Sequence, residues 1–120
     1  MEITKTMIVG LYKDTSLSLV DKAVKSARFD PEMVISGSKK MGIDYIGIEW
    51  AETRGYPYKS FKIEYDKDKG YYAVLKRNKK LKKYVNSIIV IYEYSTSNTM
   101  LDSVIRFAEL NDKKLSTYYY

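Results

Sequence analysis

The sequence predicts one α/β domain, Rossmann-like, with a mostly parallel five-stranded sheet and helices on both faces. Two observations carry this prediction. Short apolar runs alternate along the chain with segments whose apolar residues recur every three or four positions, as strands and helices do in a βαβαβαβαβ order. The length of 120 residues and the apolar fraction of 45% fit a single domain, residues 1–120, with its own core.

The first half of the chain supplies three expected strands. Residues 6–10 form a short buried strand, and 32–36 form the next one after Pro31. Residues 58–63 alternate like a half-exposed strand, so we expect them nearer an edge of the sheet.

Two helices separate these strands. The apolar face of the first consists of Leu17, Val20, Val24 and Ala27. The second begins at Ile43 and ends at Gly55, a C-cap before Pro57. Its buried face is expected to hold Ile43, Ile46, Gly47, Trp50 and Ala51.

In the second half, residues 64–70 form a loop and a third helix runs from about 71 to 85. Its inward residues are Val74, Leu81 and Val85. The segment 87–94 is the most apolar of the chain and should be the central strand.

A fourth helix begins near Thr99, where Thr99 and Asp102 fit a capping box. This helix buries Leu101, Val104, Ile105 and Ala108. Residues 114–120 close the sheet as the last strand.

Composition limits the chemistry of any site. The chain has no cysteine and no histidine, so thiol nucleophiles, imidazole bases and the usual zinc ligands are excluded, and we expect no metal and no cofactor. It has no apolar run of membrane-spanning length and no signal-peptide pattern, so we expect a cytoplasmic protein with no membrane partner.

The net charge of +6 is concentrated in one segment. Residues 76–83, KRNKKLKK, hold six basic side chains. Two interpretations stay open, a solvated helix face or a surface that faces an anion. The 13 tyrosines could stack on bases, or the terminal ones could close a strand or an interface.

Ligands of open parallel sheets bind beyond the carboxyl ends of the strands, where helix N-termini favour anions. Four connecting segments meet at that edge in the predicted order. The candidate ligand residues are Gly10, Lys13, Gly37, Ser38, Lys39, Lys40, Gly42, Asp44, Arg77, Asn78, Ser95, Ser97, Asn98 and Thr99.

Several candidates also have a purely structural interpretation. Gly37 and Gly42 serve a tight strand-to-helix turn whatever the ligand is. Asp44 either stabilises the first turn of its helix or meets a ribose hydroxyl. Arg77 and Asn78 are the best polar candidates, because a guanidinium binds phosphate through two parallel hydrogen bonds and an amide can read a base edge.

Four segments cover nearly the whole chain: IVGLYKD, VISGSKKMGIDYIGIEWAETRGYP, RNKKL and IIVIYEYSTSNTMLDSVIRFAELNDKK. In this order they resemble the SLOG superfamily of Rossmann-like nucleotide-binding domains, and its YspA-like branch in particular. The superfamily includes the LOG-type phosphoribohydrolases, the DNA-processing protein A domain that holds single-stranded DNA, and sensors of NAD-derived or cyclic nucleotide signals.

The likeness to the LOG-type enzymes implies catalytic positions. An arginine and a glutamate cleave the N-glycosidic bond in those enzymes, and the resemblance places Arg77 and Asp102 there. Ser95, Thr96 and Asn98 stand where that family has glycines. Since Asp102 is one methylene shorter than glutamate, and errors of about 1 Å can cost on the order of 100-fold in rate, hydrolysis is disfavoured.

Three functions therefore remain. The first is binding of a nucleotide or of an NAD- or ADP-ribose-derived signal, cyclic forms included, by a sensor or by a sequestering sponge of a virus or mobile element that counters a host defence. The second is a nucleoside monophosphate phosphoribohydrolase. The third is single-stranded nucleic-acid binding through residues 76–83 and the tyrosines.

Two further expectations concern partners. The resemblance implies a homodimer, or a higher homo-oligomer, formed through helices that flank the site. The loop that carries Lys39 and Lys40 is longer and more basic than in the resembled families, which suits a ligand with more than one phosphate or a bulky cyclic one.

Overall fold

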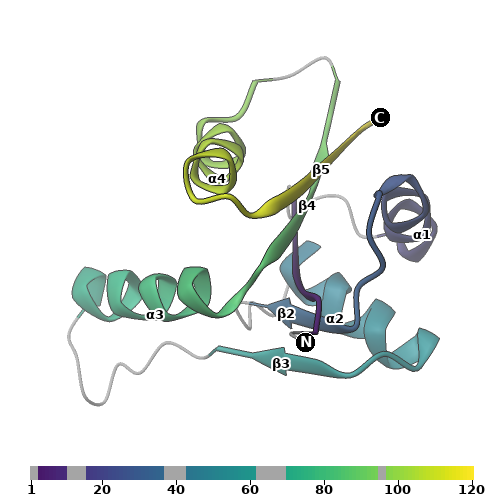
Figure 1. The fold of residues 1–120 in the computed structure, drawn as a ribbon, viewed down its shortest axis with the longest axis horizontal. Coiled ribbons are helices and arrows are strands. Elements are labelled where there is room, and N and C mark those ends of the chain that lie inside the picture. The colour runs from purple at the N-terminus through teal and green to yellow at the C-terminus, as the bar shows by residue number, and fades with distance from the viewer. Residues whose placement is uncertain (1–2, 11–15, 37–42, 62–69, 95–96) are drawn as a thin grey trace.

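The computed structural model describes residues 3–10, 16–36, 43–61, 70–94 and 97–120. Strands and helices alternate along the chain (Figure 1). The strands are β1 (Lys5–Gly10), β2 (Met33–Ser36), β3 (Tyr58–Ser60), β4 (Ser87–Tyr92) and β5 (Lys114–Tyr119). The helices are α1 (Leu17–Ser26), α2 (Ile43–Arg54), α3 (Gly70–Tyr84) and α4 (Thr99–Leu110). This order confirms the predicted alternation.

The strands form one five-stranded parallel sheet in the order β3-β2-β1-β4-β5. The fold class predicted from the sequence, a Rossmann-like α/β sheet, is thereby confirmed. The prediction that residues 87–94 form the central strand is wrong in position: β4 is fully buried but lies second from an edge, and β1 is in the middle. β3 is an edge strand, as expected.

Each face of the sheet carries two helices. Figure 1 shows α1 and α2 on one side and α3 and α4 on the other. Side chains alternate along β1 accordingly: Ile8 belongs to the core under α1 and α2, whereas Met7 and Val9 belong to the core under α3 and α4. Burial on both faces explains the apolar runs of the inner strands β1, β2 and β4, whereas the edge strands β3 and β5 are more polar and partly exposed.

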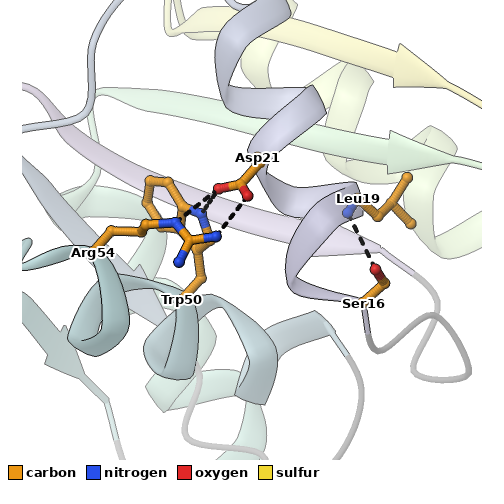
Figure 2. Close-up of polar contacts among 5 residues, drawn as sticks. All are labelled: Ser16, Leu19, Asp21, Trp50 and Arg54. Atoms are coloured by element: carbon orange, nitrogen blue, oxygen red, sulfur yellow. Dashed lines mark hydrogen bonds and ion pairs between the residues drawn. The ribbon is translucent and has the colours of Figure 1, made fainter.

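A carboxylate on α1 holds α2 in place. Asp21 Oδ1 accepts hydrogen bonds from Trp50 Nε1 at 2.6 Å and from Arg54 Nε at 3.1 Å, and its Oδ2 pairs with Arg54 Nη2 at 2.6 Å (Figure 2). Trp50 is 3% exposed, which confirms its prediction as a core residue. These contacts let the indole be buried without losing a partner for its N–H group.

The predicted apolar face of the first helix needs one correction. Val20 is buried as expected, but the second fully buried side chain is Ala23, and Leu17 and Val24 are only partly buried. Ala27 lies beyond α1 as its C-cap in extended conformation. Val20 and Ala23, three residues apart, therefore form the buried stripe of α1.

The ends of α2 and α3 follow the sequence closely. Gly55 has φ of +79°, the left-handed conformation expected of a C-cap glycine, and α2 ends just before it. α3 ends at Tyr84, so Val85, expected inside the helix, follows it and is buried. Leu81 is buried as predicted, while the side chain of Val74 lies outside the described part.

The amino edge of the sheet is closed by side chains at the start of β4. Asn86 Oδ1 accepts from the Lys5 backbone N–H at 2.8 Å, and Asn86 Nδ2 donates to the Ile3 carbonyl at 2.7 Å. The hydroxyls of Thr6 and Ser87 share a buried hydrogen bond of 2.7 Å. The side chains of Asn86, Thr6 and Ser87 are thus used within the fold.

In the described part of the chain, no helix combines the length and the apolar character needed to cross a membrane.

Candidate ligand site at the carboxyl edge of the sheet

The strand order reverses direction between β1 and β4. From β1 the chain builds outward through β2 and β3, and it then returns to place β4 and β5 on the other side of β1. Gly10, the last residue of β1, is in register with Ile91 near the end of β4. The helices that follow these neighbouring strands, α1 and α4, pack on opposite faces of the sheet. Open α/β sheets bind their ligands at such a reversal of strand order.

The N-terminus of α1 lies on one side of this point. Ser16 is its N-cap, and its Oγ accepts from the Leu19 backbone N–H at 3.3 Å (Figure 2). The first turn of α1 has no acidic residue. The positive end of this helix is therefore not neutralised by a carboxylate of its own first turn.

The N-terminus of α4 lies on the opposite face and is tied to the end of β4. Tyr92 Oη accepts from the Asn98 backbone N–H at 2.8 Å and donates to Asp102 Oδ1 at 2.9 Å. Asn98 Oδ1 accepts from the Leu101 backbone N–H at 2.9 Å. One buried tyrosine thus fixes both the cap and the first-turn carboxylate of α4 relative to the sheet.

The predicted capping box of α4 is wrong by one residue. Asn98, not Thr99, is the N-cap, and Thr99 is the first residue of the helix. Asp102 accordingly accepts from Tyr92 and does not close a box. Thr99 and Asp102 do fit the sequence pattern of a capping box, but asparagine is as good an N-cap as threonine. Asn98 takes this position, and its backbone N–H is held by the hydrogen bond to Tyr92 Oη.

The environment of Tyr92 keeps its phenol neutral. The hydrogen bond from the Asn98 N–H is the strongest single influence and favours the phenolate, but burial together with the Asp102 carboxylate outweighs it, so the pKa of Tyr92 is raised above 10.0. At neutral pH the hydroxyl is therefore a donor to Asp102. The exposed Asp102 carboxylate keeps acceptor capacity that a ligand hydroxyl can use.

Arg77 lies at a different place along the same edge. It belongs to α3, is 9% exposed, and its Nη1 donates to the Phe61 carbonyl at 3.4 Å. Phe61 directly follows β3, and its N–H donates to the Ser36 carbonyl at the end of β2. Arg77 is therefore placed beside β2 and β3, whereas Asp102 is placed beside β4.

The two candidate catalytic residues are thus separated along the sheet. β3 and β4 are three strand positions apart, which corresponds to roughly 14 Å at a spacing of about 4.8 Å. A ligand that contacts both side chains would have to extend across the ends of β2 and β1.

The other predicted residues divide into two groups. Gly10 ends β1, Ser97 and Thr99 are exposed, and Asn98 is half-buried in its cap role, so these four gather around the reversal point. Asp44 and Asn78 lie within α2 and α3, and their side chains are outside the described part. Outside the described residues altogether are Lys13, Gly37, Ser38, Lys39, Lys40, Gly42 and Ser95.

Two residues of the site were not among the candidates. Ser16 could have been found, because a serine directly before an apolar-periodic segment is a typical N-cap. Tyr92 gave no local signal, since it reads as the end of an apolar strand. Its role depends on a helix that begins seven residues later.

Among the described residues, no group of three or more acidic, cysteine or histidine side chains could hold a metal ion. Comparisons with protein-family models, with curated proteins and with solved structures found no match for this chain.

Proposed function

We propose that this protein binds a phosphate-bearing nucleotide, or an NAD- or ADP-ribose-derived signal that includes cyclic forms, at the carboxyl edge between β1 and β4. The observation that carries this proposal is the reversal of strand order at that point, flanked by capped N-termini of α1 and α4. Open α/β sheets bind ligands at such switch points.

Phosphate is the group that this edge would attract. The α1 N-terminus has no first-turn acid, and the connections that follow β1 and β2 carry Lys13, Lys39 and Lys40 in the sequence. Helix N-termini and lysines both favour a polyanion. The resemblance of this chain to SLOG domains supports the same ligand class.

Ribose is the group that the α4 side would recognise. The Asp102 carboxylate is held by Tyr92 and is exposed, so it can accept from a sugar hydroxyl. Its negative charge in the first turn of α4 also makes that helix end a poorer phosphate site than α1. We therefore propose that phosphates lie toward α1 and the sugar toward α4.

Binding without cleavage is the favoured activity, as for a sensor or a sequestering protein. Cleavage of an N-glycosidic bond needs an acidic group and its partner at one sugar, and Arg77 and Asp102 are held at different strands. Chromatography of a nucleoside monophosphate incubated with the folded protein tests this point. We expect no free base, and catalytic release of base would replace the binding proposal with the phosphoribohydrolase.

A thermal-shift panel tests binding itself. It should compare ADP-ribose, its cyclic derivatives, cyclic dinucleotides and nucleoside monophosphates, with inorganic phosphate as the control. A ligand present at 100 times its Kd stabilises the folded state by about 2.7 kcal/mol, which corresponds to a rise in Tm of roughly 10 °C for a domain of this size. No rise with any nucleotide would contradict the proposal.

A further inference from the structure

A basic pocket lies between the C-terminal halves of α3 and α4, away from the candidate ligand site. Its volume is about 310 Å³, and it is lined by Lys79, Lys82, Lys83, Phe107, Asn111 and Lys113. Lys113 directly precedes β5, whose first residue is in register with Ser87 at the start of β4. The pocket is therefore at the amino edge of the sheet, opposite the edge where β1 and β4 end.

The pocket is built for negative charge. Four of its six lining residues are lysines, and none is acidic. The α3 sequence from Gly70 to Tyr84 contains no Asp or Glu at all. Glu109 and Asp112 are nearby in sequence, but they are exposed and do not line the pocket.

An aromatic ring forms an apolar wall of the same pocket. Phe107 is half-buried, and Lys82 Nζ lies 5.0 Å from its ring centroid. Asn111 Nδ2 donates to the Phe107 backbone carbonyl, and this hydrogen bond holds the Asn111 side chain at the end of α4. Charge and a ring surface thus occur together in a space of nucleotide size.

The basic surface continues beyond the pocket along α3. Lys76 and Lys80 are exposed and lie one turn before Lys79 and Lys83. The row from residue 76 to residue 83 extends about 10 Å along the helix axis at 1.5 Å per residue. A single small anion would not use such a row, whereas a chain of phosphates would.

We propose that this face binds a single-stranded nucleic acid, with its phosphates along the α3 lysines and one base against Phe107. Lysines that track a backbone beside an aromatic ring are the usual elements of such sites. A duplex would satisfy the lysines but would keep its bases paired and away from the pocket. This inference does not rest on the proposed nucleotide function, since it concerns the other end of the molecule.

Fluorescence anisotropy with a labelled 12-nucleotide oligothymidylate tests the proposal, because salt reports the number of phosphate contacts. If each of the four lysines that line the pocket contacts one phosphate, the slope of log K against log salt is about −2.8. This slope corresponds to about a 50-fold loss of affinity from 50 to 200 mM salt. The double variant Lys79→Glu/Lys83→Glu should lose at least tenfold in affinity and show a shallower slope.

The matched control is Lys22→Glu/Lys25→Glu on α1, which changes the net charge equally on the opposite face. Lys25 and Lys83 both lie in the last turn of their helices, so each double variant places one new carboxylate at the negative end of a helix. The control should lose less than threefold in affinity. Equal losses in the two variants would show that binding follows net charge alone and would overturn the proposal.

Two competitors decide the class of partner. A duplex of the same length and polyglutamate should each compete at least tenfold more weakly than the unlabelled single strand. Stronger competition by the duplex would assign the face to double-stranded nucleic acid, and stronger competition by polyglutamate would assign it to an acidic protein; either result overturns the proposal. Both double variants should keep the nucleotide thermal shift, so failure of one proposal is distinguishable from failure of the other.

Phe107→Leu tests the ring separately. It keeps an apolar side chain in the core but removes the stacking surface, so we expect at least a fivefold loss of affinity with an unchanged salt slope. Unchanged affinity would contradict the proposal that a base stacks on Phe107. If this variant does not fold, the lysine variants alone decide.

Discussion

At the scale of single residues, Asp21 links the two helices on one face of the sheet. It accepts from the buried Trp50 indole N–H and pairs with Arg54 at the surface. Asp21→Ala would leave the indole N–H without its acceptor, so we expect a loss of about 1–3 kcal/mol in the free energy of unfolding. Urea unfolding at pH 7 measures it.

The control for this substitution is Arg54→Ala, which removes only the partner on the solvent side. Both side chains of the ion pair are substantially exposed, at 40% and 34%, so solvent screens the charge interaction. Arg54→Ala should therefore cost clearly less than Asp21→Ala. Equal costs would mean that the ion pair, and not the indole bond, holds α1 to α2.

The charge of Asp21 also predicts a pH dependence. Hydrogen bonds from Arg54 and then from Trp50 hold the pKa of Asp21 below its ordinary value of 3.8. A lowered folded-state pKa gives stability that is present above the unfolded pKa and is lost as the pH falls through the folded one. The difference in unfolding free energy between wild type and Asp21→Asn should be constant above about pH 5 and shrink toward pH 3. A difference that widens in acid would contradict this assignment.

At the scale of elements, two adjacent residues at the start of α4 should contribute differently to stability, because only Asn98 caps the helix. Asn98→Ala removes the acceptor for the Leu101 N–H and should cost about 1 kcal/mol. Thr99→Ala should change stability by less than about 0.5 kcal/mol, because Thr99 is exposed and already inside the helix. Chemical unfolding of both variants compares them. A larger loss for Thr99→Ala would restore the capping box predicted from the sequence.

The middle of α2 allows a stabilising change. Gly47 is helical and buried, and a Cβ added there would lie 3.7 Å from Ile8 Cβ and 4.0 Å from Val34 Cγ1, which are ordinary contact distances. Gly47→Ala should therefore raise the free energy of unfolding by about 0.5–1 kcal/mol through helix propensity. Thermal unfolding would show a higher Tm, and a lower one would mean that α2 packs more tightly on β1 and β2 than these distances indicate.

At the scale of the whole molecule, the sequence predicted the succession of elements because burial on two faces imposes clear periods. β4 is an apolar run and α4 has a strong three-four repeat, so the start of each was predicted correctly, although β4 ends two residues before the predicted end. The spatial order of the strands was not predicted, because a strand next to the middle of the sheet is buried on both faces just as the middle strand is, and both are therefore apolar runs. The middle position of β1 follows from pairing partners that are 28 or more residues away.

The candidate site was predictable only in part. Its position at the carboxyl edge followed from alternation alone, and Asn98, Thr99 and Gly10 do lie there. The basic run 76–83 could not reveal that Arg77 is buried while Lys79 and Lys83 are exposed, because no apolar pattern separates them within that run. Tyr92 was missed because its contacts cross from strand to helix.

We propose that a nucleotide binds at the edge where β1 and β4 end, with its phosphates attracted by the lysines that follow β1 and β2 in the sequence. Calorimetric titration of the best ligand from the thermal-shift panel into wild type, Lys39→Ala/Lys40→Ala and Lys22→Ala/Lys25→Ala tests it most directly. We predict one site in wild type, at least tenfold weaker binding in the Lys39/Lys40 variant, and unchanged affinity in the α1 control. Equal affinity in all three proteins would contradict the claim.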